Sequence, residues 1–139
     1  MKPVISLCLP AFMGNFLLLT PGLTQNISIN LEPIHPPIQI PAPGGSFNYD
    51  LTVRNTGTTP RTFSAWIMVR LPNQSWYGPV AGPTSLTVPG GAAVSRQRSQ
   101  SVPESALEGT YIFEGRVGIY PNTVWNADSF AFAKTMEGS

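Results

Sequence analysis

The stretch SFNYDLTVR, residues 46–54, decides the fold class because apolar and polar side chains alternate along it without interruption. Side chains two residues apart lie on the same face of a β-strand, so the alternation predicts a strand with one face in a core and the other in water. Turn sequences flank the strand: Gly44 and Gly45 precede it, and residues 55–58 (NTGT) follow it. The expected inward residues are Phe47, Tyr49, Leu51 and Val53.

Similar short apolar stretches recur from about Ile27 to Ala133, roughly every ten residues, each closed by a Pro, Gly or Asn cluster. The spacing predicts an all-β fold, an immunoglobulin-like antiparallel β-sandwich of about seven to eight strands. Besides 46–54, strands are expected over residues 26–32, 62–71, 76–77, 85–88, 92–102 and 109–120 and after residue 123. The proline-rich segment 33–43 is expected at a sheet edge, with a switch between sheets as one option, because proline cannot donate to a ladder.

The strand expected over residues 62–71 leaves open which face its tryptophan occupies. Alternation predicts an inward set of Phe63, Ala65, Ile67, Val69 and Leu71. Trp66 and Met68 then face the other way, unless a β-bulge shifts the phase. In the strand over 109–120 the predicted inward residues are Tyr111, Phe113, Val117 and Ile119, and the outward ones are Ile112, Glu114 and Arg116. Phe130 and Phe132 are expected to point inward from the last strand.

Residues 1–24 are typical of a secretory signal peptide, with Lys2 followed by apolar runs. Pro10, Gly14 and Asn15 interrupt those runs, so both a cleaved leader and an uncleaved anchor stay open. The sandwich is expected over residues 25–135, followed by a frayed tail over 136–139. We therefore expect a secreted protein, extracellular or at the cell surface, with no stable membrane span once the leader is removed.

Charge and cysteine content exclude several classes of function. The net charge of +1 includes Lys2, so the predicted mature domain carries seven basic and seven acidic side chains and lacks the basic excess of a nucleic-acid-binding protein. Cys8, the single cysteine, lies in the predicted leader, so no disulfide or thiolate metal site is expected. Arg96 and Arg98 share one strand face and are interpreted as a solvated ladder on an exposed sheet face rather than a phosphate or sulfate site.

Several segments carry a resemblance to a known family: residues 49–57 (YDLTVRNTG), 88–91 (VPGG), 102–103 (VP) and 108–111 (EGTY). In this order they resemble bacterial and archaeal extracellular immunoglobulin-like modules of the cell-adhesion-related type. The resemblance implies a β-sandwich that serves as spacer, adhesin or appendage to a surface enzyme. Tyr111, two residues after Gly109, resembles a tyrosine corner, whose hydroxyl bonds to nearby backbone.

Residues capable of catalysis are sparse. His35 is the only histidine, and no motif pairs it with a serine or aspartate. The seven carboxylates are spread along the chain, with Glu104 and Glu108 as weak calcium candidates in a loop that has too few oxygen ligands. We therefore predict that the protein is not an enzyme and has no cofactor and no metal site.

The aromatic residues suggest a contact surface. If Trp66 and Met68 face outward, they share a sheet face with the outward residues of strand 109–120, near further aromatics. The candidate contact residues are Trp66, Met68, Trp76, Tyr77, Ile112, Glu114, Arg116 and Trp125. The alternative is that Trp66 belongs to the core.

Two functions follow from this surface. The first is a structural or adhesion module that contacts a protein partner or self-associates, with the proline-rich first segment as a donated edge strand. The second is a small carbohydrate-binding domain in which Trp66, Trp76, Tyr77 or Trp125 stacks on sugar rings.

Overall fold

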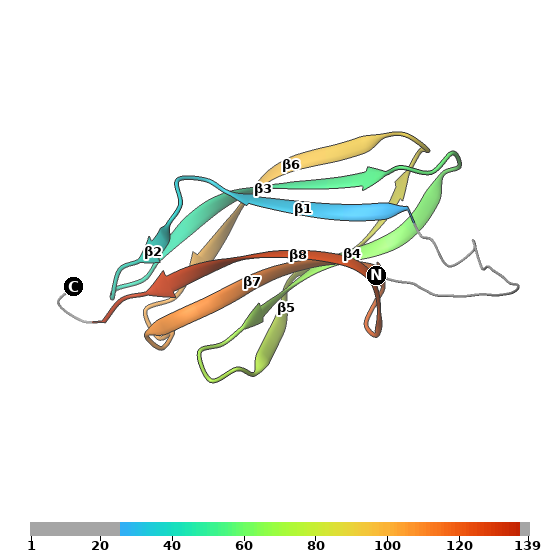
Figure 1. Ribbon diagram of the computed structural model, residues 1–139. Coiled ribbons are helices and arrows are strands. Elements are labelled where there is room, and N and C mark those ends of the chain that lie inside the picture. Colours follow the sequence, from blue (N-terminus) through green and yellow to red (C-terminus); the bar gives the residue numbers. More distant parts are fainter. Residues whose placement is uncertain (1–25, 137–139) are drawn as a thin grey trace, which may run out of the picture.

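A computed structural model gives the structure of the protein, and the residues described, 26–136, form eight strands in two facing sheets (Figure 1). The strands are β1 (Ile27–Pro33), β2 (Ile38–Ile40), β3 (Gly45–Asn55), β4 (Arg61–Arg70), β5 (Trp76–Val88), β6 (Ala93–Val102), β7 (Gly109–Ile119) and β8 (Thr123–Lys134). One sheet has the order β1-β3-β6 and the other β2-β8-β7-β4-β5. The prediction of an all-β sandwich is confirmed.

The predicted signal peptide at residues 1–24 lies outside the described residues, as do residues 137–139 of the predicted tail. Within residues 26–136 there is no helix that is long and apolar enough to span a bilayer.

The proline-rich segment moves the chain from one sheet to the other. β1 pairs antiparallel with β3 in the three-stranded sheet, whereas β2 pairs parallel with β8 at the edge of the five-stranded sheet. The expected switch between sheets is therefore confirmed. Only Ile38, Gln39 and Ile40 join the ladder, because prolines on both sides remove the N–H groups needed to extend it.

The core lies between the sheets and is built mainly of aromatic rings. Phe47 and Tyr49 of β3 meet Phe113 of β7 edge to face, with ring centroids 5.1 and 4.9 Å apart. Tyr111 stacks on Phe132 at 4.9 Å. The inward alternation predicted for residues 46–54 holds, although Leu51 is only partly buried. The interior thus depends on hydrophobic burial, the main driving force for a domain of this size.

Gly115 occupies an inward position of β7, so this position has no side chain. A Cβ at Gly115 would lie 2.8 Å from Cδ1 of Ile29 and 3.2 Å from Cδ1 of Leu31. The glycine therefore makes room for two β1 side chains, and this allows β1 to pack close to the opposite sheet.

Two strand predictions were wrong. Ile119 is 50% exposed rather than inward, because the β7–β8 register shifts between Val117 and Gly118 and ends the alternation there. β5 is one strand from Trp76 to Val88, whereas two short strands and a loop were expected. Two register shifts against β4 accommodate the prolines of β5 without ending the pairing.

Two polar side chains, those of Tyr111 and Asn55, hold turns that the sequence predicted. The Tyr111 hydroxyl donates to the carbonyl oxygen of Leu107 at 2.6 Å, which is the contact expected of a tyrosine corner. Asn55 is fully buried, and its side-chain amide donates to the carbonyl oxygens of Thr59 and Val88 at 2.9 Å. The side-chain oxygen of Asn55 accepts from the N–H of Gly57 at 2.9 Å, so the Asn-Thr-Gly turn is held by the asparagine itself.

Candidate functional site

The two lateral sides of the sandwich differ, and the difference defines the site. On the side where β1 lies beside β8 (Figure 1), polar side chains of β8 bond to the β1 backbone and so close the gap between the sheets. The N–H of Ile29 donates to Oδ1 of Asn126 at 3.0 Å, and the N–H of Leu31 donates to Oδ2 of Asp128 at 2.8 Å. These bonds occupy backbone groups that an edge strand otherwise leaves unpaired. We call this the closed side.

On the opposite side, β6 ends one sheet and β5 ends the other, and the two strands do not pair with each other. Two adjacent hollows lie between them. We call this side the open seam. It is lined by residues of β4, β5, β6 and the 103–107 loop, together with inner residues of β3. Edge strands left in this way can pair with another chain.

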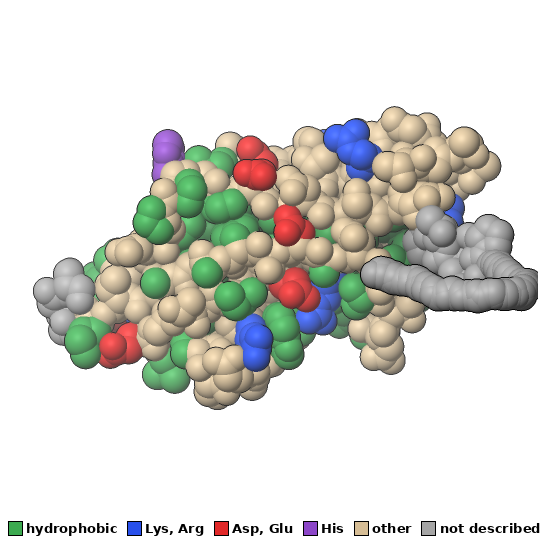
Figure 2. Space-filling view, viewed as in Figure 1, with side chains coloured by type: hydrophobic (Ala, Val, Ile, Leu, Met, Phe, Trp, Pro, Cys, Tyr) green, Lys and Arg blue, Asp and Glu red, His purple; other side chains and the backbone are tan. Residues whose placement is uncertain are grey.

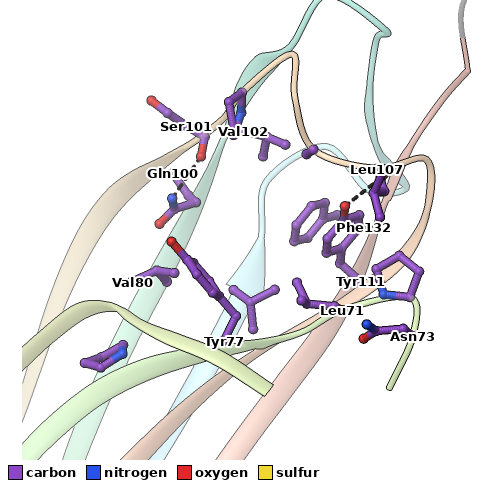
Figure 3. Close-up of a pocket in the computed structure, with 15 residues that line it drawn as sticks. Leu71, Asn73, Tyr77, Val80, Gln100, Ser101, Val102, Leu107, Tyr111 and Phe132 are labelled. Carbon is purple, nitrogen blue, oxygen red and sulfur yellow. Dashed lines mark hydrogen bonds between the residues drawn. The ribbon is translucent and has the colours of Figure 1, made fainter. Parts of the chain in front are cut away.

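The larger hollow has a volume of about 540 Å³ and is mainly apolar. Its apolar lining includes the partly buried Leu71 and Val80 and the buried Val69, Val102, Tyr111 and Phe132. Tyr77 of β5 and Gln100 of β6 point toward one another across the opening (Figure 3). Tyr77 is 62% exposed, so its ring is available to a ligand at the rim.

The smaller hollow, of about 230 Å³, contains both arginines of β6. Arg98 lies opposite Tyr49 and Arg96 opposite Leu51 in the β3–β6 ladder, so both side chains share the inner face with those core residues. Both arginines are exposed, in line with the interpretation as a solvated ladder, but they lie on the face of β6 that also carries core contacts with β3, at the open side of the sandwich. The face depends on the register with β3, which the spacing within β6 does not reveal. No acidic side chain of residues 26–136 forms an ion pair with either arginine.

The positive charge of Arg98 acts on Tyr49, the buried tyrosine opposite it in the ladder. Burial raises the pKa of Tyr49 above its ordinary value of 10.0, and the positive charge of Arg98 offsets part of that rise. Arg98 is itself exposed, so it presents its charge both to this tyrosine and to the solvent of the open seam.

The outer edge of β6 leaves backbone groups without a partner strand. The N–H of Ile29 points away from β3. The backbone N–H and C=O of its ladder partner Val53 therefore point toward β6 and bond with those of Val94. Alternation along β6 then directs the backbone groups of Ser95, Gln97, Ser99 and Ser101 outward. Two of the outward carbonyls accept side-chain bonds, from Arg96 to Ser95 at 2.8 Å and from Gln100 to Ser101 at 2.9 Å.

The structure distributes the predicted contact residues over three places. Trp66, Met68, Ile112, Glu114 and Arg116 lie on the outer face of the five-stranded sheet, in an unbroken β4–β7 register. Trp66 nevertheless has only 2% of its surface exposed, because Tyr120 packs edge to face on it with ring centroids 5.2 Å apart. Trp66 is thus buried on the outer face and lies outside the cluster between the sheets, and the β4–β5 register shifts beside it, between Ala65 and Ile67. The burial agrees with the alternative in which Trp66 is a core residue, whereas its outer-face position agrees with the predicted alternation.

Trp76 contacts the outer-face residues through the guanidinium groups of Arg116 and Arg70. The guanidinium carbon of Arg116 lies 4.6 Å from the centroid of the Trp76 ring, and that of Arg70 lies 6.0 Å away. Arg116 also forms an ion pair with Glu114 at 2.7 Å. Trp76 keeps 43% of its surface exposed. These contacts give the tryptophan a structural role on this face.

Tyr77 and Trp125 lie apart from this group. Tyr77 follows Trp76 on β5 and therefore points to the opposite face, toward the open seam. Trp125 packs near Phe63, with ring centroids 6.3 Å apart, and the Arg61 guanidinium carbon lies 5.1 Å from its ring centroid. The expectation that all these aromatics form one platform is not met.

On the face shown in Figure 2, charged side chains are few, in line with a charged fraction of 11% in the whole sequence. Among residues 26–136, no three His, Cys, Asp or Glu side chains come together in a group that could hold a metal ion.

Several solved structures have a similar architecture. The CARDB domain of a Pyrococcus furiosus protein in complex with di-metal ions is 16% identical, has a TM-score of 0.51, and matches 80% of this chain and 94% of its own. The chain resembles a CARDB-type, immunoglobulin-like β-sandwich. No protein-family model and no curated protein sequence matches it.

Parts of larger proteins are also similar. The Pseudomonas fluorescens alkylpurine DNA glycosylase AlkC has a TM-score of 0.63 at 14% identity, with 80% of this chain matching 31% of that one. The Bacteroides uniformis beta-glucuronidase has a TM-score of 0.60 at 13% identity, with 78% of this chain matching 14% of the enzyme. The chain thus spans less than a third of these two proteins, and the likeness shows that this fold is used as a module of larger proteins.

Proposed function

We propose that this chain is a non-enzymatic module that makes protein–protein contacts outside the cell or at the cell surface, in adhesion or envelope structure. The observation that carries the proposal is the open seam. One side of the sandwich is closed by hydrogen bonds from β1 to β8, whereas the other leaves a strand edge and apolar hollows accessible. Accessible strand edges beside apolar surface are the features on which chains pair.

Self-association by donation of the first segments has less support than contact with a different chain. Within the proline-rich segment 33–43 only the three residues of β2 form a ladder, and Ile38 and Ile40 are buried there. β1 pairs with β3 along its whole length from Ile27 to Pro33, and Asn126 and Asp128 bond to its other edge. Donating β1 to a neighbour would break both sets of bonds and expose Ile27, Ile29 and Leu31. β6 is the better available edge, and it acts as an acceptor.

A carbohydrate-binding role has weaker support because the aromatics do not form one surface. Trp66 is buried, Trp76 carries Arg116 against its ring, and Trp125 lies elsewhere. Sugar stacking needs an exposed aromatic face, and Tyr77 offers one only beside the open seam.

Site-specific photo-crosslinking tests the contact function. A photoreactive amino acid replaces Gln97 on the β6 edge, and a matched variant carries it at Asn30, which is exposed on the outer face of the same sheet. In the organism that makes the protein, we expect the Gln97 variant to crosslink to one discrete protein and the Asn30 variant to crosslink to none. A contact module is contradicted if neither variant, nor one at Trp76, yields a discrete product.

The compartment needs a separate test. Cell fractionation and intact mass measurement of the full chain should find it outside the cytoplasm. An unprocessed chain confined to the cytoplasm would contradict secretion.

A further inference from the structure

We infer that β6 accepts an extended segment of a partner protein as a fourth strand of the three-stranded sheet, and that this segment carries two acidic residues spaced two apart. The inference rests on the proposed contact function and goes beyond it by naming the edge and the chemistry of the partner. The backbone, the two arginines and the apolar hollows each support it.

The backbone of β6 offers the first requirement, an extended and accessible edge. β6 runs for 10 residues from Ala93 to Val102, and no strand within residues 26–136 pairs with its outward backbone groups. The bonds that Arg96 and Gln100 make to outward carbonyls come from exposed or half-exposed side chains. An incoming strand can replace them with ladder hydrogen bonds.

The other edges of the sandwich are poorer acceptors. The free edge of β1 is occupied by side chains of β8. β2 has only three residues, and β5 contains Pro79 and Pro83, which lack N–H groups and interrupt its pairing. Only β6 combines length, regular register and freedom from proline.

The arginines define the charge of the segment. Arg96 and Arg98 lie two residues apart on the inner face of β6, and no acidic side chain within residues 26–136 forms an ion pair with them. Residues directly opposite one another on adjacent strands pair side chain to side chain. A partner with Asp or Glu at two alternate positions would place one carboxylate beside each guanidinium.

The hollows define the rest of the segment. A fourth strand beyond β6 would lie over β5, and its inward side chains would cover Leu86 near the arginines and Val80 in the larger hollow. The partner residue placed opposite Gln100 would face the opening between Gln100 and Tyr77 (Figure 3). A volume of about 540 Å³ there accommodates an aromatic or a large aliphatic side chain. The partner segment therefore alternates, with two acidic residues and a bulky apolar one at successive inward positions, the apolar residue on the C-terminal side of the acidic pair in a parallel segment and on the N-terminal side in an antiparallel one.

Peptide selection tests the inference. A random dodecapeptide phage library is selected on the immobilised full chain, and the recovered peptides are measured by fluorescence anisotropy. We expect peptides with acidic residues at two alternate positions and a bulky apolar residue two positions away from the pair, after it in a parallel segment or before it in an antiparallel one. The double variant Arg96→Gln/Arg98→Gln should weaken their binding at least tenfold. The control Arg54→Gln, an exposed arginine at the end of β3, should change it less than twofold.

A backbone variant separates strand addition from charge attraction. Gln97→Pro removes an outward N–H of β6 while leaving the side chains of Arg96 and Arg98 in place, so it should also weaken the selected peptides. Circular dichroism melting shows whether this variant folds, and if it does not, protection of the outward β6 amides by the bound peptide in hydrogen exchange decides the question.

The outcomes distinguish the inference from the function on which it rests. Peptides that bind equally well to the double arginine variant, or no enriched peptides at all, overturn the inference. Arginine-dependent binding of a heparin fragment in place of peptides also overturns it. A crosslinked partner at Trp76 rather than at Gln97 would leave the contact function standing without the β6 strand.

Discussion

Oδ2 of Asp128 accepts a hydrogen bond of 2.8 Å from the backbone N–H of Leu31, and this bond joins the edge of one sheet to the inner face of the other. The open seam has no equivalent contact. The asymmetry explains how a sandwich can be stable along one side and available for pairing along the other.

Loss of this carboxylate should destabilise the fold. Asp128→Ala leaves the Leu31 N–H without an acceptor, and we expect the free energy of unfolding to fall by about 1–3 kcal/mol, the usual effect of losing a charged acceptor. Urea titration measures it. The control Asp50→Ala, at an exposed position of β3, should stay within about 0.5 kcal/mol of the parent. Equal effects of the two variants would contradict the role of Asp128.

Trp66 should behave as a buried residue although it lies on an outer sheet face. Trp66→Ala removes a ring that is 2% exposed and should cost about 3–5 kcal/mol of unfolding free energy. Trp76→Ala, at 43% exposure, should cost less than about 1 kcal/mol. A double-mutant cycle with Tyr120 should give a coupling of about 0.5–1.5 kcal/mol. A mild effect of Trp66→Ala would show that Tyr120 does not cover the ring.

The tyrosine corner can be tested by removing one oxygen. Tyr111→Phe deletes the 2.6 Å hydrogen bond to the Leu107 carbonyl and keeps the stacking on Phe132. We expect a loss of about 0.5–1.5 kcal/mol in chemical denaturation. Tyr77→Phe, at an exposed tyrosine, serves as the control and should leave the midpoint unchanged.

Stability should fall at alkaline pH. Burial raises the pKa of Tyr49 and of Tyr111 above 10.0, so these hydroxyls ionise more readily in the unfolded chain than in the folded one. Their contribution is therefore complete below about pH 10 and is lost as pH rises through the folded-state pKa values. Denaturation midpoints between pH 9 and 12 should decline less steeply in Tyr49→Phe and Tyr111→Phe. Unaltered slopes in both variants would contradict the raised pKa values.

The sequence predicted strands best where one face is buried and the other exposed. Residues 46–54 show the alternation because β3 is covered on one side only, and the prediction matches β3 within about one residue at each end. The pattern was less informative for β5, where glycines and prolines indicated a loop but register shifts let the strand continue. Local propensity does not report such tertiary adjustments.

The candidate site was harder to predict for a similar reason. The spacing of Arg96 and Arg98 showed that they share a face, but only the register against Tyr49 and Leu51 shows that it is the inner face. The burial of Trp66 likewise depends on Tyr120, a residue distant in sequence whose contact no local pattern reveals.

Amide hydrogen exchange of the full chain tests the central claim most directly. In the isolated protein, the outward N–H groups of Ser95, Gln97 and Ser99 should exchange rapidly, while those of Arg96 and Arg98, bonded to β3, stay protected. A saturating selected peptide should then protect the three outward amides. If they are already protected in the isolated protein, or if the bound peptide protects amides elsewhere and leaves these exposed, then β6 is not an acceptor edge.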